Sequence, residues 1–475
     1  MLTPPPPPTN DPRQTTSPPS VACPLSPVVS LPPLPTFAPS VIRTLCAAGH
    51  EAWLVGGCVR DLLLGRAPHD YDVVTSALPD QIEALFSSTV AVGKAFGIIT
   101  IVAPTGENVE VATFRSDSAY LDGRHPTSVA FTDARTDVLR RDFTVNALLL
   151  DPDTGEIADY VGGRADLAAR VIRAIGDPAR RFAEDRLRML RAVRFAAALG
   201  FSIDPDTWSA ILDAAPAITQ ISAERIRDEL FKTLLTALHP GQALQTLLDS
   251  GLLAQFLPEI AAMVGVEQPP EFHPEGDVFV HTRIMLDALP PPGPNRTLRL
   301  ALAVLFHDVG KPPTAALLPR PDGPPRWAFR EHAAVGAAMT EAILQRLRAP
   351  NDLTESVVRL VRTHMRTADA PKMRRAKLRA LLGDPLFDDM LALHKLDCAA
   401  SHGDCEAADF LDRVAAEFAA EPALPPPLIR GRDLLPLGYP PGPALGVLLH
   451  HLYDLQLEHD YTSPSQLLPH LPPPP

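Results

Sequence analysis

The pattern of hydrophobic and polar positions divides the chain into a mixed first part and a helical remainder. Near the N-terminus, short β-branched runs bounded by Gly or Asn are typical of strands, and amphipathic runs between them favour helices. Beyond about residue 165, apolar positions recur at helical spacing, which indicates an all-helical body. We expect strands at 51–57, 97–103 and 108–114, helices at 41–50 and 80–86, and either a strand or a buried helix at 143–151.

Proline marks the ends of the chain and the breaks between its parts. The 475 residues include 54 prolines, many of them in the first 38 residues and at the C-terminus. Such stretches favour polyproline II or disorder and cannot bury enough apolar surface to fold. Pro and Gly clusters near 258–276, 289–295 and 421–443 indicate a linker, a loop and a last boundary. A chain of this length is expected to form several domains.

Charge and cysteine content narrow the possible classes of protein. The net charge is −13, so any nucleic-acid interface must be a local basic face. Residues 161–200 provide one, with nine Arg against four Asp and Glu. Five scattered cysteines without a CxxC fit a reducing cytoplasm and argue against a disulfide framework. We find no secretory signal pattern and no apolar run long enough to span a membrane.

Residues 54–75, LVGGCVRDLLLGRAPHDYDVVT, combine a glycine turn with two closely spaced acids. Gly56 and Gly57 lack a Cβ, so their backbone can approach a phosphate closely. Asp70 and Asp72 are two positions apart, and on a strand they would point to the same face. Such a pair can share two divalent metals, and Mg²⁺ prefers one or two carboxylates together with substrate phosphates. The segment therefore predicts transfer of a nucleotide from a nucleoside triphosphate.

This segment resembles the head of the polymerase-beta-like nucleotidyltransferases. It is most similar to their class II branch, which contains the tRNA CCA-adding enzymes and the bacterial poly(A) polymerases. The run at 159–178, DYVGGRADLAARVIRAIGDP, is similar to the hinge that follows the head in this family. The resemblance covers about residues 48–450. It implies catalysis by Asp70 and Asp72, with Glu110 on the strand at 108–114 as a third carboxylate.

The resemblance also implies a nucleotide site built around arginines. Guanidinium groups form bidentate pairs with phosphate oxygens, and Asp122 and Arg124 belong to a glycine-bearing loop suited to movement near a substrate. Arg115 could lie near the triphosphate or near the RNA end. The implied nucleotide-binding residues are Gly56, Gly57, Arg60, Arg115, Asp122, Arg124, Arg141, Asp142, Asn146, Asp185, Arg188, Arg191 and Arg194.

Residues 180–201 are predicted to form one amphipathic helix that carries Asp185 and Arg188. Three positions apart, these two side chains would be neighbours on its surface. They could form a simple ion pair, or they could meet the Watson–Crick edge of a base. Adenine and cytosine both present an exocyclic amine to a carboxylate, whereas G and U lack that amine at the corresponding position. The EDxxRxLRxxRF pattern resembles the family's nucleotide-selection helix and supports the second interpretation.

A second set of residues with metal-ligand chemistry lies between residues 271 and 397. The segments FVHT, FHDVGKP, EHAAVGA, THM and LHKLDC resemble successive elements of the HD superfamily of metal-dependent phosphohydrolases. Imidazole and carboxylate ligands suit Mn²⁺, Ni²⁺, Fe²⁺ or Mg²⁺, and a bound metal could activate water against a phosphoester. The implied ligands are His281, His307, Asp308, His332, His364 and Asp397.

Together these features predict an α+β protein with a small mixed-sheet head, an all-α neck and body, and an all-α HD domain. The expected parts are a Pro-rich disordered leader at 1–38, the nucleotidyltransferase head at 39–165, the neck and body at 166–270, the HD domain at 271–420, and a C-terminal segment with a Pro-rich tail at 421–475.

The function predicted from these residues is template-independent addition of C and A to tRNA 3′ ends from CTP and ATP, with Mg²⁺ in the head and a second divalent metal in the HD domain. Addition of A alone and poly(A) synthesis remain alternatives, because these enzymes share the head motifs. A phosphohydrolase with a nucleotide-binding head is an alternative of another class. A cytoplasmic protein without a membrane partner is expected, and the sequence leaves the oligomeric state open.

Overall fold

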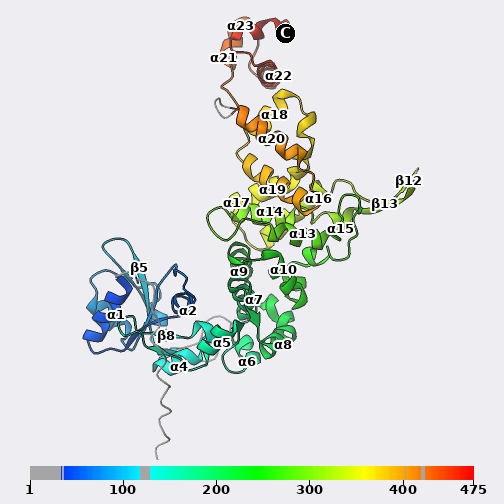
Figure 1. The fold of residues 1–475 in the computed structure, drawn as a ribbon. Coiled ribbons are helices and arrows are strands. Elements are labelled where there is room, and N and C mark those ends of the chain that lie inside the picture. The colour runs from blue at the N-terminus through cyan, green and yellow to red at the C-terminus, as the bar shows by residue number, and fades with distance from the viewer. Residues whose placement is uncertain are drawn as a thin grey trace, which may run out of the picture.

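The computed structural model describes residues 34, 37–117, 129–321, 323–401, 403–418 and 423–474. Figure 1 shows a head that contains the main sheet, a helical body beside it, and further helices that rise from the other end of the body towards the C-terminus. The asymmetric arrangement leaves the head on one side of a long helical stack. The predicted α+β architecture is confirmed.

The head is built on a seven-stranded mixed sheet with the strand order β3-β4-β5-β2-β1-β8-β9. Only β2 and β5 run parallel to each other; the other pairs are antiparallel. Its strands are β1 (Ala52–Val55), β2 (Asp72–Thr75), β3 (Thr89–Val90), β4 (Ile98–Val102), β5 (Asn108–Thr113), β8 (Leu149–Leu150) and β9 (Ile157–Ala158).

Both faces of the sheet are buried at its centre, where β1, β2 and β8 are apolar at consecutive positions, whereas β4 and β5 alternate between buried and more exposed residues. Leu54 and Val73 belong to the large core that also contains the inner face of helix α1 (Phe37–Ala47). Their neighbours Val55 and Val74 point into a second, smaller core on the opposite face. Successive strand residues alternate between faces, so each central strand joins two cores and is fixed in register.

Shorter elements surround the sheet and complete the head. The residues at 143–151, for which the sequence left two possibilities, form a 3₁₀ turn followed by strand β8. The remaining elements are α2 (Gly57–Leu63), α3 (Pro79–Leu85), η1 (Lys94–Phe96), the antiparallel pair β6 (Arg115–Asp117) and β7 (Val129–Phe131), α4 (Ala134–Leu139) and η2 (Thr144–Asn146).

The body is helical apart from one short pair of parallel strands. The single helix predicted over 180–201 is wrong: α6 ends at Glu184 and α7 begins at Leu187. The body elements are α5 (Gly163–Ala169), β10 (Val171–Ile172), α6 (Pro178–Glu184), α7 (Leu187–Leu199), β11 (Ser202–Ile203), α8 (Pro205–Ala214), η3 (Ala215–Gln220), α9 (Ala223–Thr236), α10 (Pro240–Asp249), α11 (Leu252–Phe256) and α12 (Pro258–Ala261).

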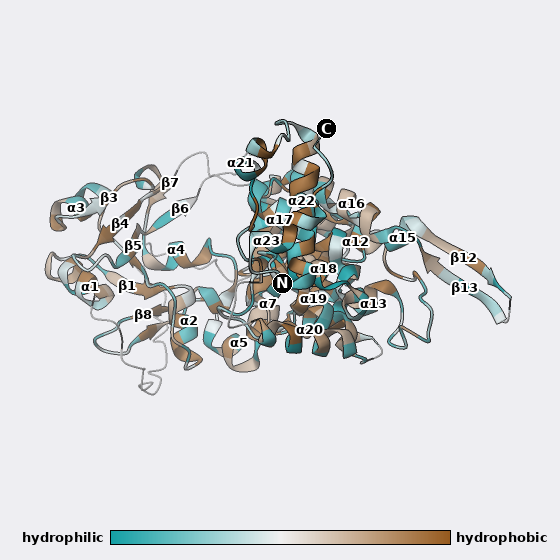
Figure 2. Cartoon of the chain, turned by 90° about the horizontal axis from the view of Figure 1, so that it is seen from above, coloured by the Kyte–Doolittle hydropathy of each residue, from teal (hydrophilic) through white to brown (hydrophobic). Residues whose placement is uncertain are grey.

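The HD region packs its helices around α14, whose residues from Leu300 to Phe306 are all buried. It also contains a two-stranded hairpin that the sequence analysis missed, and this hairpin projects from the helices in both Figure 1 and Figure 2. The elements are α13 (Val278–Asp287), α14 (Leu298–Phe306), α15 (Lys311–Thr314), β12 (Ala315–Arg320), β13 (Gly323–Phe329), α16 (His332–Arg346), α17 (Asn351–Thr363), η4 (His364–Lys372), α18 (Arg375–Leu382), α19 (Phe387–Ala400) and α20 (Glu406–Glu417).

The C-terminal segment forms helices with a small core of its own. This core contains Ile429, Leu434, Tyr439, Leu452 and Leu467. The elements are α21 (Gly431–Leu434), η5 (Leu435–Leu437), α22 (Pro443–His459), α23 (Pro464–Leu467) and η6 (Leu468–His470). Of the helices in the described ranges, none combines the length and the apolar character needed to cross a bilayer.

Candidate active site and metal centre

An acidic cluster lies at the edge of the head sheet where β2 and β5 run side by side. Asp72 is the first residue of β2, and its register partner on β5 is Glu110. Paired residues on adjacent strands point to the same face, so both carboxylates lie on one side of the sheet. Asp70 precedes the strand and is exposed. The two aspartates therefore do not share a strand as their spacing suggested, although Asp70 lies close enough to act on Asp72.

Burial and two neighbouring carboxylates disfavour the charged form of Asp72. One side of Asp72 is open to solvent, yet the surrounding protein removes part of its hydration. Burial, followed by repulsion from Glu110 and Asp70, raises the pKa of Asp72 to about 6, while Arg141 opposes the rise. A cluster of carboxylates of this kind favours a bound cation.

A cavity of about 370 Å³ joins the acidic edge of the head to the first helices of the body. Gly56 has a φ of +81°, and a Cβ there would lie 3.8 Å from Asp72 Oδ2 and 3.9 Å from Arg141 Nη1. The glycine thus lets bare backbone face both charged groups. The lining residues are Gly56, Gly57, Arg60, Asp72, Arg140, Arg141, Asp142, Asn146, Asp185, Arg188, Arg191 and Phe195.

A second cavity of about 230 Å³ shares Asp72, Arg140 and Arg141 with the first. Glu110 and Arg115 line only this second space. Arg115 also donates its Nη1 hydrogen to the carbonyl of Phe96. The predicted catalytic acid and this arginine therefore lie beside the main cavity and not in its lining.

Asp137 holds two arginines at the cavity, and the sequence analysis did not identify it. Its buried carboxylate receives Arg140 Nη2 at 2.7 Å and Arg141 Nη2 at 3.0 Å. Burial alone would raise the pKa of Asp137, but Arg141 and Arg140 hold it below its ordinary value. The DxxRR spacing in the sequence was the available signal, because residues three and four apart on a helix are neighbours.

A polar network connects the glycine turn with the body through Asp142. Arg60 Nη1 donates to Asn146 Oδ1 at 2.6 Å, and Asn146 Nδ2 donates to Asp142 Oδ1 at 3.4 Å. Arg191 donates through Nε and Nη2 to Asp142 Oδ2, at 2.8 and 2.6 Å. Burial opposes the charge of Asp142, but Arg191 holds the pKa of this carboxyl below its usual range. Four predicted nucleotide-site residues are thus bonded to one another.

Asp185 and Arg188 face the same cavity, but they are not an ion pair on one helix. Asp185 lies in the break between α6 and α7, where its Oδ1 accepts from Leu187 N at 3.1 Å and its Oδ2 from Arg225 Nη2 at 2.8 Å. Arg188 donates to the carbonyl of Arg140 at 3.0 Å. These bonds fix both groups, so their remaining hydrogen-bonding positions are presented to the cavity in a defined geometry.

Two of the predicted nucleotide-site residues that the structure describes, Arg115 and Arg194, do not line the main cavity. Arg194 points to α9, where its Nε donates to Glu229 Oε2 at 2.6 Å, and it is absent from the cavity lining. Asp122 and Arg124 fall between residues 117 and 129 and lie outside the described residues. The main cavity thus contains the glycine turn, Asp72 and five arginines from three places: Arg60 of α2, Arg140 and Arg141 after α4, and Arg188 and Arg191 of α7.

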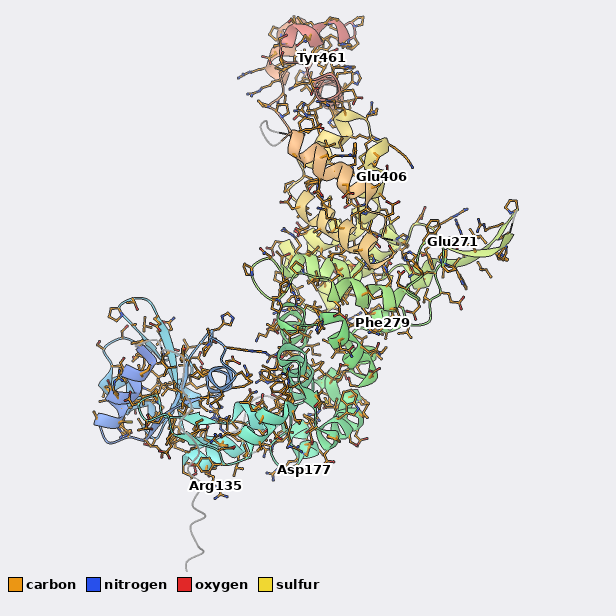
Figure 3. The ribbon with its side chains drawn as sticks, in the orientation of Figure 1. Arg135, Asp177, Glu271, Phe279, Glu406 and Tyr461 are labelled. Atoms are coloured by element: carbon orange, nitrogen blue, oxygen red, sulfur yellow. The ribbon has the colours of Figure 1, made fainter. Side chains whose placement is uncertain are left out.

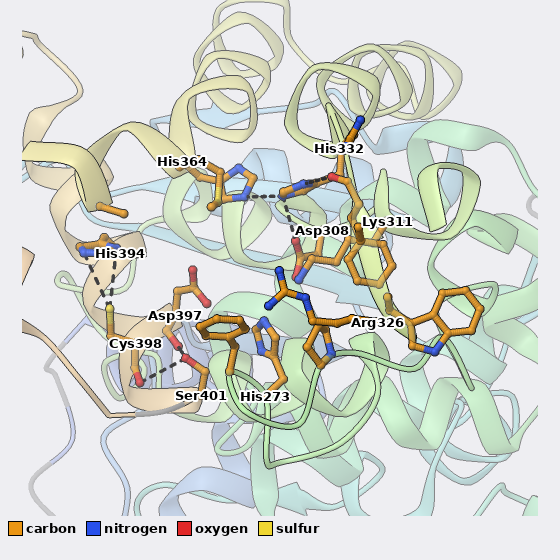
Figure 4. A pocket seen from close by; sticks show the side chains of 18 residues that line it. His273, Asp308, Lys311, Arg326, His332, His364, His394, Asp397, Cys398 and Ser401 are labelled. Carbon is orange, nitrogen blue, oxygen red and sulfur yellow. Dashed lines mark hydrogen bonds and ion pairs between the residues drawn. The ribbon is translucent and has the colours of Figure 1, made fainter. Parts of the chain in front are cut away.

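The six residues implied by the HD resemblance converge in the third part of the chain. His281 Nε2 lies 3.1 Å from Asp397 Oδ1, and His307 Nε2 lies 3.0 Å from Asp308 Oδ2. His332 Nε2 lies 3.6 Å from Asp308 Oδ1. The sixth residue, His364, lies 3.2 Å from His332 between their Nε2 atoms. Residues separated by more than 100 positions therefore form one centre, as Figure 4 shows for Asp308, His332, His364 and Asp397.

The imidazole rings are oriented as metal ligands usually are. His307, His332 and His364 each direct Nδ1 to a backbone carbonyl, at 2.8, 2.9 and 2.7 Å, which leaves Nε2 facing the centre. Buried Nε2 of His281, Nε2 of His307 and Asp308 Oδ2 make no well-aligned hydrogen bond among the described residues. These atoms contact one another or a charged neighbour across the centre, and the donor set that they form fits a divalent metal.

The charges at this centre depend on one another. Burial disfavours a charged Asp308, but His307 and Lys311 hold its pKa well below the ordinary value. Burial also disfavours a charged His281, yet hydrogen bonds to Asp397 and Glu275 raise its pKa to about 9. Burial, followed by the neighbouring His307, lowers the pKa of His364 to about 4.

Two further residues complete the centre and were not predicted. Lys311 is buried and binds Asp308 Oδ2 at 2.7 Å and Gln268 Oε1 at 2.6 Å. Glu275 accepts from His281 Nδ1 at 2.6 Å, in the manner of the carboxylates that orient metal-bound imidazoles. The only sequence signal for Glu275 was its position in the segment before FVHT.

Known families match three successive regions of the chain. The family described as "Poly A polymerase head domain" matches residues 52–173, the one described as "Probable RNA and SrmB-binding site of polymerase A" matches 200–264, and "HD domain" matches 277–414. The chain therefore contains regions similar to a poly(A) polymerase head, its RNA-binding site and an HD domain, in this order. The resemblance inferred from the sequence is confirmed, including the HD domain.

Curated relatives and solved structures agree with this assignment. The CCA-adding enzyme of Levilactobacillus brevis is 47% identical over 226 residues, which cover 47% of this chain and 56% of that protein. The CCA-adding enzyme of Bacillus subtilis is 46% identical over 213 residues, covering 45% of this chain and 53% of that protein. The chain thus spans about half the length of the curated relatives it matches.

The similarity in three dimensions extends over nearly the whole chain. The crystal structure of the Bacillus stearothermophilus CCA-adding enzyme in complex with CTP superposes with a TM-score of 0.70, at 26% identity, over 91% of this chain and 96% of that one. The Thermotoga maritima CCA-adding enzyme complexed with tRNA has a TM-score of 0.58 at 18% identity, over 91% and 93% of the two chains. The second likeness supports the fold alone.

Proposed function

We propose that this chain is a template-independent RNA nucleotidyltransferase that adds C and A to tRNA 3′ ends from CTP and ATP. The observation that carries the proposal is the single cavity that brings together Asp72, the Asp137-bound arginines and the pair Asp185 and Arg188. Relatives named CCA-adding enzymes, one of them solved with CTP, support it.

Each side of the cavity suits one part of the nucleotide. Gly56 and Gly57 expose backbone to the phosphates, and Arg140 and Arg141 supply positive charge there. Asp72 and Glu110 offer hard oxygen donors that fit Mg²⁺, and Asp70 stands beside them. When bound, such an ion activates the attacking ribose hydroxyl and stabilises the leaving pyrophosphate.

The base is selected by Asp185 and Arg188. A carboxylate oxygen of Asp185 accepts a hydrogen bond from the exocyclic amine that adenine and cytosine share. Arg188 donates to a ring nitrogen or carbonyl of the same edge. Because other residues already fix both groups, a base that carries a carbonyl where adenine and cytosine carry the amine leaves the carboxylate partly unpaired. That mismatch disfavours G and U.

The experiment uses tRNA that ends at the discriminator base, with CTP, ATP or both, and sequences the 3′ ends. We expect CC with CTP alone and CCA with both nucleotides. Asp72→Asn should abolish incorporation while tRNA binding persists, and Asp80→Asn, an exposed helix acid that pairs with Lys94, should behave like the wild type. Retained incorporation by Asp72→Asn would overturn the assignment. Growth by A alone on CC-ended tRNA would identify an A-adding enzyme, and long oligo(A) on unstructured RNA would identify a poly(A) polymerase.

We propose, as a second function, hydrolysis of phosphate esters at the HD centre. The histidines and aspartates that converge there, with their buried Nε2 atoms facing inward, are the observation that favours it. Mn²⁺, Ni²⁺, Fe²⁺ and Mg²⁺ all fit this donor set. The test is phosphate release under each metal, with His364→Gln as the inactive variant and Asp72→Asn as the active control.

We place the enzyme in the cytoplasm, where its free cysteines would stay reduced.

A further inference from the structure

A large cavity opens directly beside the HD centre, and the hairpin β12–β13 forms one of its walls. Its volume is about 440 Å³. Four consecutive hairpin residues, from Arg326 to Phe329, face Asp308, His332 and His364 across this space. The sequence predicted an HD domain made of helices alone. The hairpin adds a surface to the centre that the metal ligands do not provide.

Arg326 is the cation that the hairpin brings to this cavity. Figure 4 shows its guanidinium turned inward between His273 and Asp308. Its nearest acid is Glu271, at 3.5 Å, and its side chain is 41% exposed. It also stands 5.6 Å from the centre of the Phe272 ring. Figure 3 places Glu271 where the hairpin leaves the helices, so this contact steadies the arginine at the cavity mouth.

A second cation lies deeper in the cavity and is already paired. Lys311 is buried and bound to both Asp308 and Gln268, so its charge offsets that of Asp308. Arg330 also lines the cavity, but it is exposed at the rim. Arg326 is therefore the half-buried positive group that an incoming anion would meet next to the metal ligands.

Flat apolar side chains lie next to Arg326. Phe272, Trp327 and Phe329 line the same cavity, and Trp327 is held by a hydrogen bond from its Nε1 to Glu267 Oε2 at 3.0 Å. A guanidinium beside aromatic rings suits a ligand that carries both a phosphate and a planar base. A simple phosphate would use the first of these features and leave the second exposed.

We propose that Arg326 is a specificity-determining residue of the HD cavity and that it binds a phosphate oxygen of a nucleoside phosphate ester whose base lies against Trp327 and Phe272. The proposal rests on the hydrolase function proposed above. In that reaction a bond forms from the water oxygen to phosphorus, the ester P–O bond breaks, and the ribose oxygen takes the proton that water loses. Arg326 holds the ester in place for this exchange.

Two arginines of the same hairpin provide a matched comparison. Arg320 also pairs with Glu271, at 3.3 Å, but does not line the cavity. The probes are adenosine 3′-monophosphate and a tRNA that ends in a 3′-phosphate, so free nucleotide and RNA end are distinguished as sources of the ester. For the preferred probe, Arg326→Gln should raise KM about tenfold or more with little change in kcat, as expected for loss of a charged hydrogen bond. Arg320→Gln should match the wild type, and Arg326→Lys should recover part of the loss.

A binding measurement removes the dependence on turnover. The chain has three tryptophans, so replacing Trp53 and Trp208 by Phe leaves Trp327 as the single indole reporter. Its fluorescence should change as adenosine 3′-monophosphate is added to the metal-free protein, and Arg326→Gln should shift the titration to higher concentration. If the reporter protein gives the same titration with Arg326 and with Arg326→Gln, the assignment of Arg326 is wrong.

The outcomes separate the two proposals. If the wild type hydrolyses neither probe with any of the four metals, the hydrolase function and this inference both fall. If the wild type is active but Arg326→Gln behaves like Arg320→Gln, only the role of Arg326 is wrong. Cleavage of either probe with a selective defect in Arg326→Gln supports the inference and shows which source of ester the cavity accepts.

Discussion

The buried carboxylate of Glu229 holds the helix that carries Arg188 and Arg191 against the rest of the body. Glu229 is 3% exposed on α9 and receives Arg194 Nε from α7 at 2.6 Å. Its other oxygen lies 3.9 Å from Arg191 Nη1. Replacing Glu229 by Ala would leave Arg191 and Arg194, three positions apart on α7, with Asp142 as the main acid that still balances their charge.

The expected loss of stability follows from this burial. Removing one partner of a buried ion pair leaves an uncompensated charge and costs about 3–5 kcal/mol. Glu224 provides a control on the same helix, because it pairs with Arg348 at the surface, where solvent screens the interaction. Glu224→Ala should therefore change stability far less. Glu229→Gln should be intermediate, since an amide still accepts one hydrogen bond.

The assay must be local because a chain of several domains does not unfold in one step. Hydrogen exchange of the α7 and α9 amides reports the stability of their contact directly. We expect a selective loss of protection there in Glu229→Ala, together with a higher KM for CTP, because Arg191 also binds Asp142 in the nucleotide cavity. If Glu229→Ala loses no more protection than Glu224→Ala, the buried network does not hold the helix.

Three further predictions concern metals and backbone packing. Because the pKa of Asp72 is about 6, protons should compete with Mg²⁺ as the pH falls through 6, and calorimetry should show weaker Mg²⁺ binding at pH 5.5 than at pH 7.5. As the pH falls, the folded metal-free protein binds a proton at Asp72 at a higher pH than the unfolded chain does. Its free energy of unfolding should therefore rise as the pH falls from 6 towards 4, and Asp72→Asn should remove that dependence. Gly163→Ala places a Cβ 2.3 Å from the Thr144 carbonyl and should lower the melting temperature, whereas Gly446→Ala, with open space around it in α22, should be neutral or stabilising by about 0.4–1 kcal/mol. His364→Gln should reduce the metal content measured by mass spectrometry while nucleotide addition continues.

The head could be predicted well because its chemistry is local in sequence. The glycine pair and the acids stand within 20 residues of one another, and β-branched runs mark the strands that carry Asp72 and Glu110. The buried core on each face explains why β2 is apolar at consecutive positions after Asp72, whereas β5 alternates and leaves Glu110 exposed. The histidines of the HD centre were equally recognisable, since each lies in a short segment of distinctive composition.

What the sequence did not predict depends on contacts between distant residues. The break at Asp185 interrupts a run of good helix formers, and it exists because Arg225 on α9 and the Leu187 amide bind that carboxylate. The role of Asp137 needed the positions of Arg140 and Arg141 in space. The hairpin was missed because prolines at 319–325 argue against strands, although the Asp-Gly pair at 322–323 is a hairpin turn signal.

The most direct test of this account is an experimental structure of the chain with Mg²⁺ and a non-hydrolysable analogue of CTP. We expect the triphosphate beside Gly56 and Gly57, metal density at Asp72, and the cytosine edge within hydrogen-bonding distance of Asp185 and Arg188. A nucleotide bound with its base away from these two side chains, or with its phosphates away from Asp72, would contradict this expectation.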